Sequence, residues 1–290
     1  MSDLYEKITA TIIEQLEAGT KPWQKPWEGS GSATPLAMPT NASTGNTYRG
    51  INIPLLWMAA ENGEYACHEW STYRQWQEQK ESVGKGEKGT LIIYYDTFEK
   101  EQDDGDLKKM PFIKCSYVFN RCQLASYTPG SIVPPTPKPL IERIAAVDEF
   151  IANTKAIIEH KGNRACYVPA KDKIYMPKAE AFIATEGSTA TENYYSTLLH
   201  ETAHWSGHPT RCNRNLKGRF GSQHYAMEEL VAELSAAFLC ASLDITNAPR
   251  PDHANYLASW LKALKDDKKA IFTAASQAHK ATDYLSALME

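Results

Sequence analysis

Residues 200–204 of this 290-residue chain have the sequence His-Glu-Thr-Ala-His, which predicts both a local fold and a chemistry. Two histidines four positions apart project from one face of an α-helix, so both imidazoles can reach one metal ion. Glu201 follows His200 directly, so its carboxylate can accept a proton from a water bound to that ion. The pattern predicts a catalytic zinc site with His200 and His204 as ligands and Glu201 as general base.

The residues around this pentapeptide predict the helix on which it must lie. Apolar and small residues keep a helical spacing between positions 194 and 203. Thr189 to Glu192 has the Thr-x-x-Glu pattern of a capping box, and Gly207 is typical of a helix end. We therefore expect a helix with one buried face over 191–206.

A second helix, expected over 223–242, offers a third metal ligand. Glu229 and Glu233 lie on one flank of its apolar stripe, at about 100° of helix rotation per residue. A carboxylate flanked there by small residues has room to approach a metal held by the neighbouring helix. We take Glu229 as the third ligand and Glu233 as the residue that orients a histidine N–H. The reverse assignment stays open, because helical phase does not fix depth, and Glu228 is expected to point towards solvent.

Two histidines and a carboxylate favour Zn²⁺, and Mn²⁺ or Co²⁺ also accept such ligands. Composition restricts the class of protein further. Hydrophobic content of 42% and charged content of 23% are typical of a globular chain. No apolar run approaches the roughly 18 residues that a membrane span needs, and the first residues do not resemble a secretory signal. Six cysteines without a Cys-x-x-Cys pair favour free thiols, so we expect a cytoplasmic protein with no membrane association.

The proline-rich segment at residues 129–139 predicts a domain boundary. Five prolines lie within residues 127–139, which excludes a helix or a central strand and favours an extended linker. We expect one domain over 1–128, the linker over 129–139 and a second domain over 140–290.

Periodicity predicts the elements of each domain. In the first we expect helices over 4–16 and 72–79, a helix through 55–58, and paired strands at 90–95 and 114–120. In the second we expect helices over 140–160, 191–206, 223–242, 252–265 and 267–288, with strands at 165–168 and 173–177. A short sheet before the metal-site helix suits a zincin-like protease, because its edge strand can hold an extended substrate. The fold class is therefore α+β, with a small α+β domain followed by a mainly helical domain with a short antiparallel sheet.

Aromatic and basic residues in the first domain suggest a surface for unpaired bases. Five of the seven tryptophans precede residue 128, and three of them, Trp57, Trp70 and Trp76, are expected in the core. Rings next to Lys or Arg can stack on bases and contact phosphates. The net charge of −4 confines such contacts to a local patch. The candidate DNA-binding residues are Trp23, Lys25, Trp27, Tyr48, Arg49, Asn52, Lys85 and Lys88.

The order of motifs along the whole chain carries a family resemblance. The motifs are Pro26-Trp27, Tyr-Arg-Gly-Ile-Asn at 48–52, Gly-Lys-Gly-Glu-Lys-Gly at 84–89, Val118-Phe119-Asn120, the 200–204 motif and Glu-Glu-Leu-Val-Ala-Glu-Leu at 228–234. Together they resemble the ArdC-type antirestriction proteins carried by conjugative plasmids. The resemblance implies a single-stranded-DNA-binding domain joined to a zincin-like metallopeptidase domain, which protects incoming plasmid DNA from host restriction. The first domain also resembles the corresponding region of plasmid-encoded primases.

Three functions fit these features. The first is an antirestriction protein that binds single-stranded DNA and cleaves an unknown protein substrate, with host restriction machinery as a candidate. The second is a DNA-binding protein whose metal site is non-catalytic and which protects DNA by occlusion. The third is an intracellular metallopeptidase with no DNA role, which predicts no salt-dependent affinity for oligonucleotides.

Overall fold

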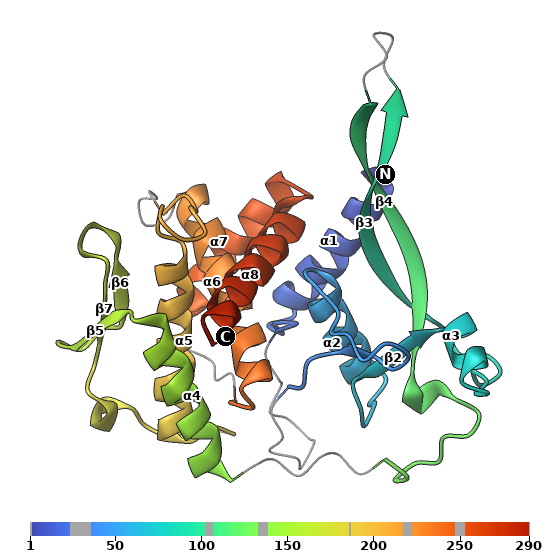
Figure 1. Ribbon diagram of the computed structural model, residues 1–290, viewed down its shortest axis with the longest axis horizontal. Helices are drawn as coiled ribbons and strands as arrows, with labels where there is room; N and C mark the ends of the chain where they lie inside the picture. Colours follow the sequence, from blue (N-terminus) through green and yellow to red (C-terminus); the bar gives the residue numbers. More distant parts are fainter. Residues whose placement is uncertain are drawn as a thin grey trace. The chain divides into compact units, whose positions relative to one another are not determined.

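The computed structural model describes residues 2–23, 36–101, 107–132, 139–185, 187–216, 222–246 and 253–289. These residues form two compact units, whose elements are labelled in Figure 1. Unit 1 consists mainly of residues 39–134, and unit 2 of residues 3–38 and 135–290. The chain therefore changes units near residue 38 as well as near residue 134, and residues 133–138 of the expected linker lie outside the described part.

Unit 1 is built on a four-stranded sheet in the order β1-β2-β4-β3. Its strands are β1 (Thr40–Asn41), β2 (Glu69–Thr72), β3 (Thr90–Glu101) and β4 (Leu107–Asn120). The β3–β4 hairpin is antiparallel and longer than expected, and it projects from the unit in Figure 1. The short strands β1 and β2 were not expected, because two and four residues are too few to show a strand periodicity.

One face of this sheet is covered by α2 (Asn52–Asn62). Leu56 of α2 packs in a core cluster with Trp70, Ile92 and Val118 of the sheet. The short helix α3 (Tyr73–Glu78) begins at a capping box on Thr72, and the 3₁₀ turn η1 (Arg121–Gln123) follows β4. Trp57, Trp70 and Trp76 are buried, as expected.

Unit 2 combines helices with a second, three-stranded sheet. Its helices are α1 (Ser2–Glu17), α4 (Leu140–Thr154), α5 (Ala190–Ser206), α6 (Gln223–Ser242), α7 (His253–Asp266) and α8 (Ala270–Ser286). Its strands are β5 (Ile157–His160), β6 (Cys166–Val168) and β7 (Lys173–Met176), in the order β5-β7-β6. β7 pairs in parallel with β5 and antiparallel with β6, so β6 lies at an edge.

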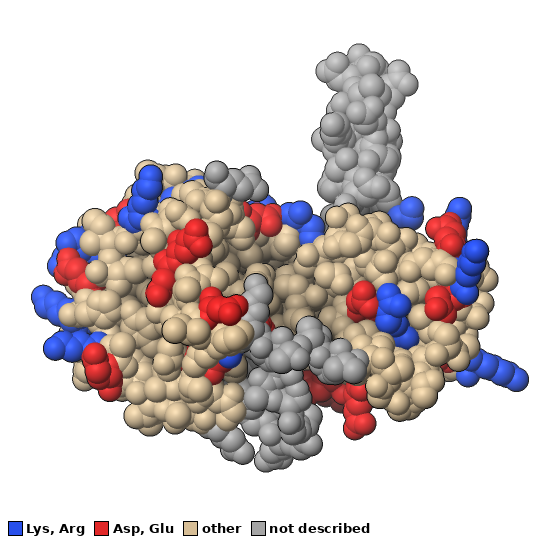
Figure 2. Space-filling view, turned by 60° about the horizontal axis from the view of Figure 1, so that its bottom comes forward, with Lys and Arg blue, Asp and Glu red and all other residues tan. Residues whose placement is uncertain are grey.

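The prediction of a helix over 140–160 is wrong at its C-terminal end, because α4 ends at Thr154. Lys155 adopts a left-handed conformation with φ of 56°, which ends α4 at Thr154. The next residues then extend into β5, so the short sheet is mixed rather than purely antiparallel. Among the helices of the described residues, none has the length and apolar character needed to cross a membrane. Charges of both signs are interspersed over the face drawn in Figure 2.

The N-terminal helix α1 packs in unit 2, although the sequence placed it in the first domain. The Thr9 hydroxyl donates to the Lys268 carbonyl at 2.7 Å, and the Tyr5 ring meets Phe272 edge-on at 4.6 Å. The buried stripe of α1 is Ile8, Ile12 and Leu16. Burial of this stripe, together with the Thr9 and Tyr5 contacts to residues 268 and 272, accounts for the place of α1 in unit 2.

Candidate metal centre

Helices α5 and α6 bring two histidines and a glutamate together. α5 begins at the expected capping box, in which the Thr189 hydroxyl accepts from the Glu192 N–H at 3.1 Å. The Nε2 atoms of His200 and His204 lie 3.1 Å apart. On α6, the Glu229 carboxylate lies 3.6 Å from Nε2 of His200 and 3.5 Å from Nε2 of His204. The three side chains therefore converge on one point.

The two separations between Glu229 and the histidines match those around a divalent cation, and the two Nε2 atoms are about 0.2 Å closer together than in such a site. A tetrahedral ion with bonds of about 2.0–2.2 Å holds its ligand atoms roughly 3.3–3.6 Å apart. Glu229 is buried, and its Oε2 atom has no hydrogen-bond partner among the described residues. A buried carboxylate oxygen without a partner is costly unless a cation or donor satisfies it. In the described part of the chain, His200, His204 and Glu229 form the group whose ligand atoms could hold one metal.

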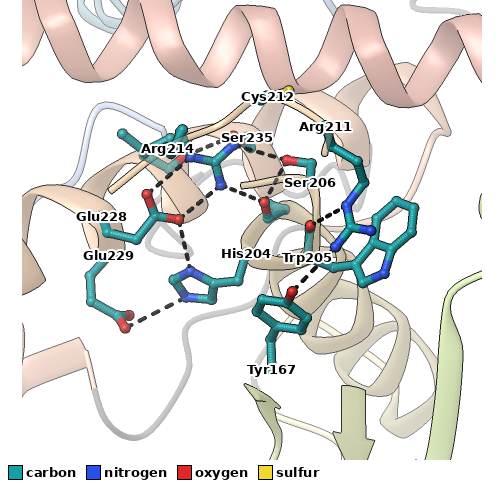
Figure 3. Close-up of polar contacts among 12 residues, drawn as sticks. Tyr167, His204, Trp205, Ser206, Arg211, Cys212, Arg214, Glu228, Glu229 and Ser235 are labelled. Atoms are coloured by element: carbon teal, nitrogen blue, oxygen red, sulfur yellow. Dashed lines mark hydrogen bonds and ion pairs between the residues drawn. The ribbon is translucent and has the colours of Figure 1, made fainter. Parts of the chain in front are cut away.

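Each histidine has a second carboxylate at its other ring nitrogen. Glu233 Oε1 lies 3.4 Å from His200 Nδ1, the place expected for it from the sequence. Glu228 Oε1 lies 3.1 Å from His204 Nδ1, as Figure 3 shows. A carboxylate at Nδ1 favours a proton there, which leaves the Nε2 lone pair for a metal. The two pairs therefore orient both imidazoles towards the site.

The expectation that Glu228 points to solvent is wrong, because Arg214 draws it inwards. Arg214 donates from Nη2 and Nε to the two oxygens of Glu228, at 2.8 and 3.0 Å. Its Nη2 and Nη1 also donate to the Ala203 carbonyl at 2.6 Å and the Ser206 hydroxyl at 2.9 Å, in the last turn of α5. Figure 3 shows Arg214 beside Glu228, which in turn contacts His204. Arg214 lies outside the periodic helices, so sequence reasoning had no signal for it.

Electrostatics favour positive charge at this point. Burial lowers the pKa of His204, but Glu229 and Glu228 outweigh burial and raise it to about 10. Burial raises the pKa of Glu229, but His204 and His200 outweigh burial and hold it well below its usual range. Because a divalent cation supplies positive charge as the proton on His204 does, the carboxylates that raise the pKa of His204 also favour a metal.

Glu201, the neighbour of His200 on α5, contacts the edge of the short sheet. Its Oε2 atom accepts a hydrogen bond from the Tyr167 backbone N–H at 2.8 Å. Tyr167 is the central residue of β6, which pairs only with β7 among the described strands. The N–H that meets Glu201 therefore belongs to the unpaired edge of β6. The predicted base and the predicted substrate-binding strand meet in the structure.

Three of the candidate DNA-binding residues have structural roles instead. The Trp23 ring is fully buried in unit 2, 6.1 Å from the Trp260 ring, so it cannot stack on a base. Tyr48 is buried, and its hydroxyl donates to the Trp70 carbonyl at 3.3 Å. Asn52 exchanges two hydrogen bonds of 2.8 Å with the backbone of Ile93, which pins α2 to β3. Their burial speaks against direct contact with DNA, and their assignment to DNA binding stays a prediction without support from the structure.

The remaining candidates divide into two groups. Arg49, Lys85 and Lys88 are exposed on unit 1 and stay candidates. Lys25 and Trp27 lie outside the described residues.

Unit 1 has an exposed aromatic face that was not predicted from the sequence. Tyr117 and Phe119 alternate along β4 and share the face opposite to the α2 core, and their exposed neighbour Tyr73 meets Phe119 edge-on at 6.2 Å. Tyr73 is 48% exposed and Tyr117 is 58% exposed. A Cβ at Gly89 would lie 2.9 Å from Tyr117 Cβ and 3.0 Å from the Phe119 ring, so glycine admits both side chains. The alternation Tyr117-x-Phe119 in a predicted strand could have indicated this face, because alternate residues of a strand share one side of the sheet.

Comparison with known families finds two matches, and the match to residues 2–119 includes the N-terminal residues that pack in unit 2. Residues 145–277 match the zincin-like metallopeptidase family MPTase-PolyVal. Residues 2–119 match the N-terminal domain of anti-restriction factor ArdC. Fold and site thus define a protein that combines an ArdC N-terminal domain with a zincin-like domain.

Relatives and solved structures extend the match over the whole chain. The metal-free crystal structure of antirestriction protein ArdC from the R388 plasmid has a TM-score of 0.78 and 38% identity, covering 99% of this chain and 98% of that one. Its Mn(II)-bound structure gives 0.76 and 36%, with the same coverage. The uncharacterised protein y4eC of Sinorhizobium fredii is 41% identical over 99% of this chain and 92% of its own length.

DNA primase TraC of Escherichia coli is 37% identical over 98% of this chain, which spans 27% of the length of TraC. The chain belongs to the ArdC antirestriction family, which confirms the resemblance. The Mn(II)-bound relative and the converging ligands together indicate a divalent-metal site.

Proposed function

We propose that this protein protects incoming plasmid DNA from host restriction by binding single-stranded DNA through unit 1 and hydrolysing a protein substrate at a zinc site in unit 2. The observation that carries the hydrolytic part is the meeting of Glu201 with the edge strand β6 beside the three converging ligand side chains. Family membership supports the antirestriction role.

In this proposal His200, His204 and Glu229 hold Zn²⁺, which supplies Lewis acidity and lowers the pKa of a bound water. With such an ion bound, Glu201 would be placed to accept a proton from the attacking water and to pass it to the leaving amine. A peptide that adds as a strand along β6 needs the Tyr167 N–H, which Glu201 now occupies. Substrate binding therefore exchanges this hydrogen bond and frees the carboxylate to act as base.

The aromatic face of unit 1 supports single-stranded DNA binding. Tyr73, Tyr117 and Phe119 offer rings for unpaired bases, and base stacking tolerates any sequence. Lys85 and Lys88 lie on the turn that ends at Gly89, next to these rings, where they can contact phosphates. The turn is anchored to η1, because Gln123 Nε2 donates to Glu87 at 2.8 Å and to the Lys88 carbonyl at 3.0 Å.

The hydrolytic part is tested by Glu201→Gln. We expect the variant to keep one equivalent of metal by elemental analysis, because Glu201 is not among the converging ligands. We expect restriction protection in recipient cells to fall by about 10²–10⁴-fold at equal protein level, because the proton acceptor is lost. Glu180→Gln, an exposed carboxylate, is the matched control. Protection that survives with metal bound favours the occlusion function, and loss of metal contradicts the assignment of Glu201 as base.

The DNA-binding part is tested by Tyr117→Ala, measured by anisotropy of a labelled oligothymidylate. We expect the affinity for the oligonucleotide to fall about 5- to 100-fold, which corresponds to the stacking energy of one base on an aromatic ring. Tyr94→Ala is the matched control, because Tyr94 is 42% exposed but lies on the opposite face of the sheet. Equal losses in both variants would contradict the aromatic face. Absence of any salt-dependent binding by the wild type would favour a metallopeptidase without a DNA role.

A further inference from the structure

Two cysteines that are 55 positions apart meet at one edge of unit 1. The Sγ atoms of Cys67 and Cys122 lie 3.9 Å apart. Cys67 precedes β2 and Cys122 lies in η1, directly after β4. Because β2 and β4 pair antiparallel with Trp70 opposite Asn120, the segments just beyond this pair are brought together. Both thiols are partly exposed, so a small reagent can reach them.

We propose that Cys67 and Cys122 are a redox-active thiol pair that closes to an intramolecular disulfide by exchange with a low-molecular-weight disulfide such as oxidised glutathione. A disulfide needs its sulfurs about 2.05 Å apart and Cβ atoms about 3.5–4.5 Å apart. The sulfurs lie 3.9 Å apart, so closure requires them to approach by about 1.9 Å.

The two thiols have different chemical roles. The hydrogen bond from Cys67 lowers the pKa of Cys122 to about 6, with further help from the backbone N–H groups of Ala66 and Cys67 and from the Tyr127 hydroxyl. The same hydrogen bond to Cys122 raises the pKa of Cys67 well above its usual range, so Cys67 retains its proton. Since the thiolate is the nucleophile, Cys122 attacks first.

The exchange balances in two steps. The Cys122 thiolate attacks one sulfur of oxidised glutathione, which breaks the glutathione S–S bond and releases one glutathione thiolate. Cys67 then gives up its proton to solvent or to the released thiolate. Its sulfur attacks Cys122 in the mixed disulfide and releases the second glutathione. The protein pair loses two electrons, and one glutathione disulfide becomes two glutathione thiols.

The bond would form at the anchor of the basic turn at 84–89. Asn120 connects the cysteines, because its Nδ2 donates to the Cys67 carbonyl and its Oδ1 accepts from the Cys122 N–H, both at 2.9 Å. Gln123 accepts from the Asn120 N–H at 2.8 Å and also holds the turn. A disulfide therefore locks covalently the segment that positions this turn.

The first test equilibrates the full metal-bound chain with glutathione buffers of increasing oxidised fraction, followed by alkylation and peptide mass spectrometry. We expect a linked pair of peptides containing Cys67 and Cys122, while the exposed Cys115 of the same unit stays alkylated. Cys67→Ser should give only a glutathione adduct on Cys122, and Cys115→Ser should behave as wild type. Two reduced thiols in excess oxidised glutathione, or an unresolved adduct on wild-type Cys122, would overturn the proposal.

The second test measures the consequence for unit 1 by differential scanning calorimetry. Closure of a loop between residues 55 positions apart restricts the unfolded chain, so the melting temperature of unit 1 should rise by roughly 8–30 °C on oxidation. Dithiothreitol should reverse the shift, and Cys122→Ser should show none. An oxidised wild type with an unchanged or lower melting temperature would contradict the locking of this segment.

Discussion

At the scale of single residues, the metal centre depends on a carboxylate that an arginine holds in place. The Arg214 side chain is 4% exposed and connects Glu228 to the last turn of α5. Glu228 then contacts the Nδ1 atom of His204, and its own burial is offset by Arg214 and His204, which lower its pKa. A histidine that is oriented in advance binds a metal without losing further side-chain freedom.

Glu228→Gln should weaken metal binding without abolishing it. The amide keeps the shape but removes the charge that supports His204, so we expect affinity to fall about 10- to 100-fold. Competition with a zinc-sensitive dye measures this directly, with no need for a substrate. Glu149→Gln, exposed on α4, is the control. If the variant bound metal as tightly as wild type, Arg214 and Glu228 would only stabilise the C-terminal end of α5, with no effect on the metal centre.

At the scale of elements, the start of α5 is held by one buried carboxylate. Glu192 accepts from the Thr189 N–H at 3.1 Å and from the Thr246 hydroxyl at 2.9 Å. Its side chain is 7% exposed and pairs with Arg143 of α4 at 3.0 Å. Glu192 therefore caps the metal-site helix and also joins α5 to α4. The capping box was predictable from the sequence, and the partners from α4 and from residue 246 were not.

Glu192→Ala should destabilise unit 2 by about 3 kcal/mol at pH 7, because Arg143 loses its buried partner. Burial raises the pKa of Glu192, but its hydrogen bonds to Thr189 and Thr246 and its pair with Arg143 outweigh burial and lower it. A lowered folded-state pKa gives stability that is present above the unfolded value of about 4.3 and lost as pH falls through the folded value.

Urea unfolding at several pH values measures this effect. The difference in free energy of unfolding between wild type and Glu192→Ala should narrow as the pH drops below about 4. Glu142→Ala, on the exposed surface of α4, should show no such narrowing. A difference that is constant with pH would mean that the carboxylate charge does not contribute.

At the scale of the whole molecule, the first helix and the residues after it complete unit 2. Trp23 meets Trp260 at 6.1 Å, and Trp260 stacks on Tyr256 at 6.0 Å. The Tyr256 hydroxyl lies 3.1 Å from the hydroxyl of Tyr225 on α6. This row of aromatic side chains runs from the N-terminal segment to the helix that carries Glu229. The unit that holds the metal centre is thus assembled from both ends of the sequence.

Trp23→Ala should destabilise unit 2 by about 3–5 kcal/mol, because it leaves a large cavity beside Trp260. Calorimetry of the full chain should show a lower melting temperature for unit 2 and an unchanged one for unit 1. Trp76→Ala, equally buried but in unit 1, should give the opposite pattern. If Trp23→Ala leaves unit 2 unchanged and weakens DNA binding, Trp23 belongs to the DNA surface after all.

Local patterns in the sequence were sufficient for the metal-site helix and most other helices. The spacing of His200 and His204 and the capping box at Thr189 depend on residues within one or two turns, so helical geometry specifies them. The flank occupied by Glu229 and Glu233 follows from the same periodicity. Only the packing of α6 against α5 decides that Glu229, and not Glu233, lies close to both Nε2 atoms. The reason is that the depth of each carboxylate depends on the neighbouring helix.

Contacts between distant segments could come only from the folded chain. Arg214 with Glu228, Cys67 with Cys122 and Trp23 with Trp260 join residues that no local pattern relates. Even Asn52, which the sequence offered as a DNA-binding residue, uses its side-chain amide to bind the backbone of β3. Backbone propensity and periodicity act over a few residues, whereas burial and side-chain pairing depend on which surfaces meet. That is why the candidate metal ligands could be predicted from the sequence and the residues that support them could not.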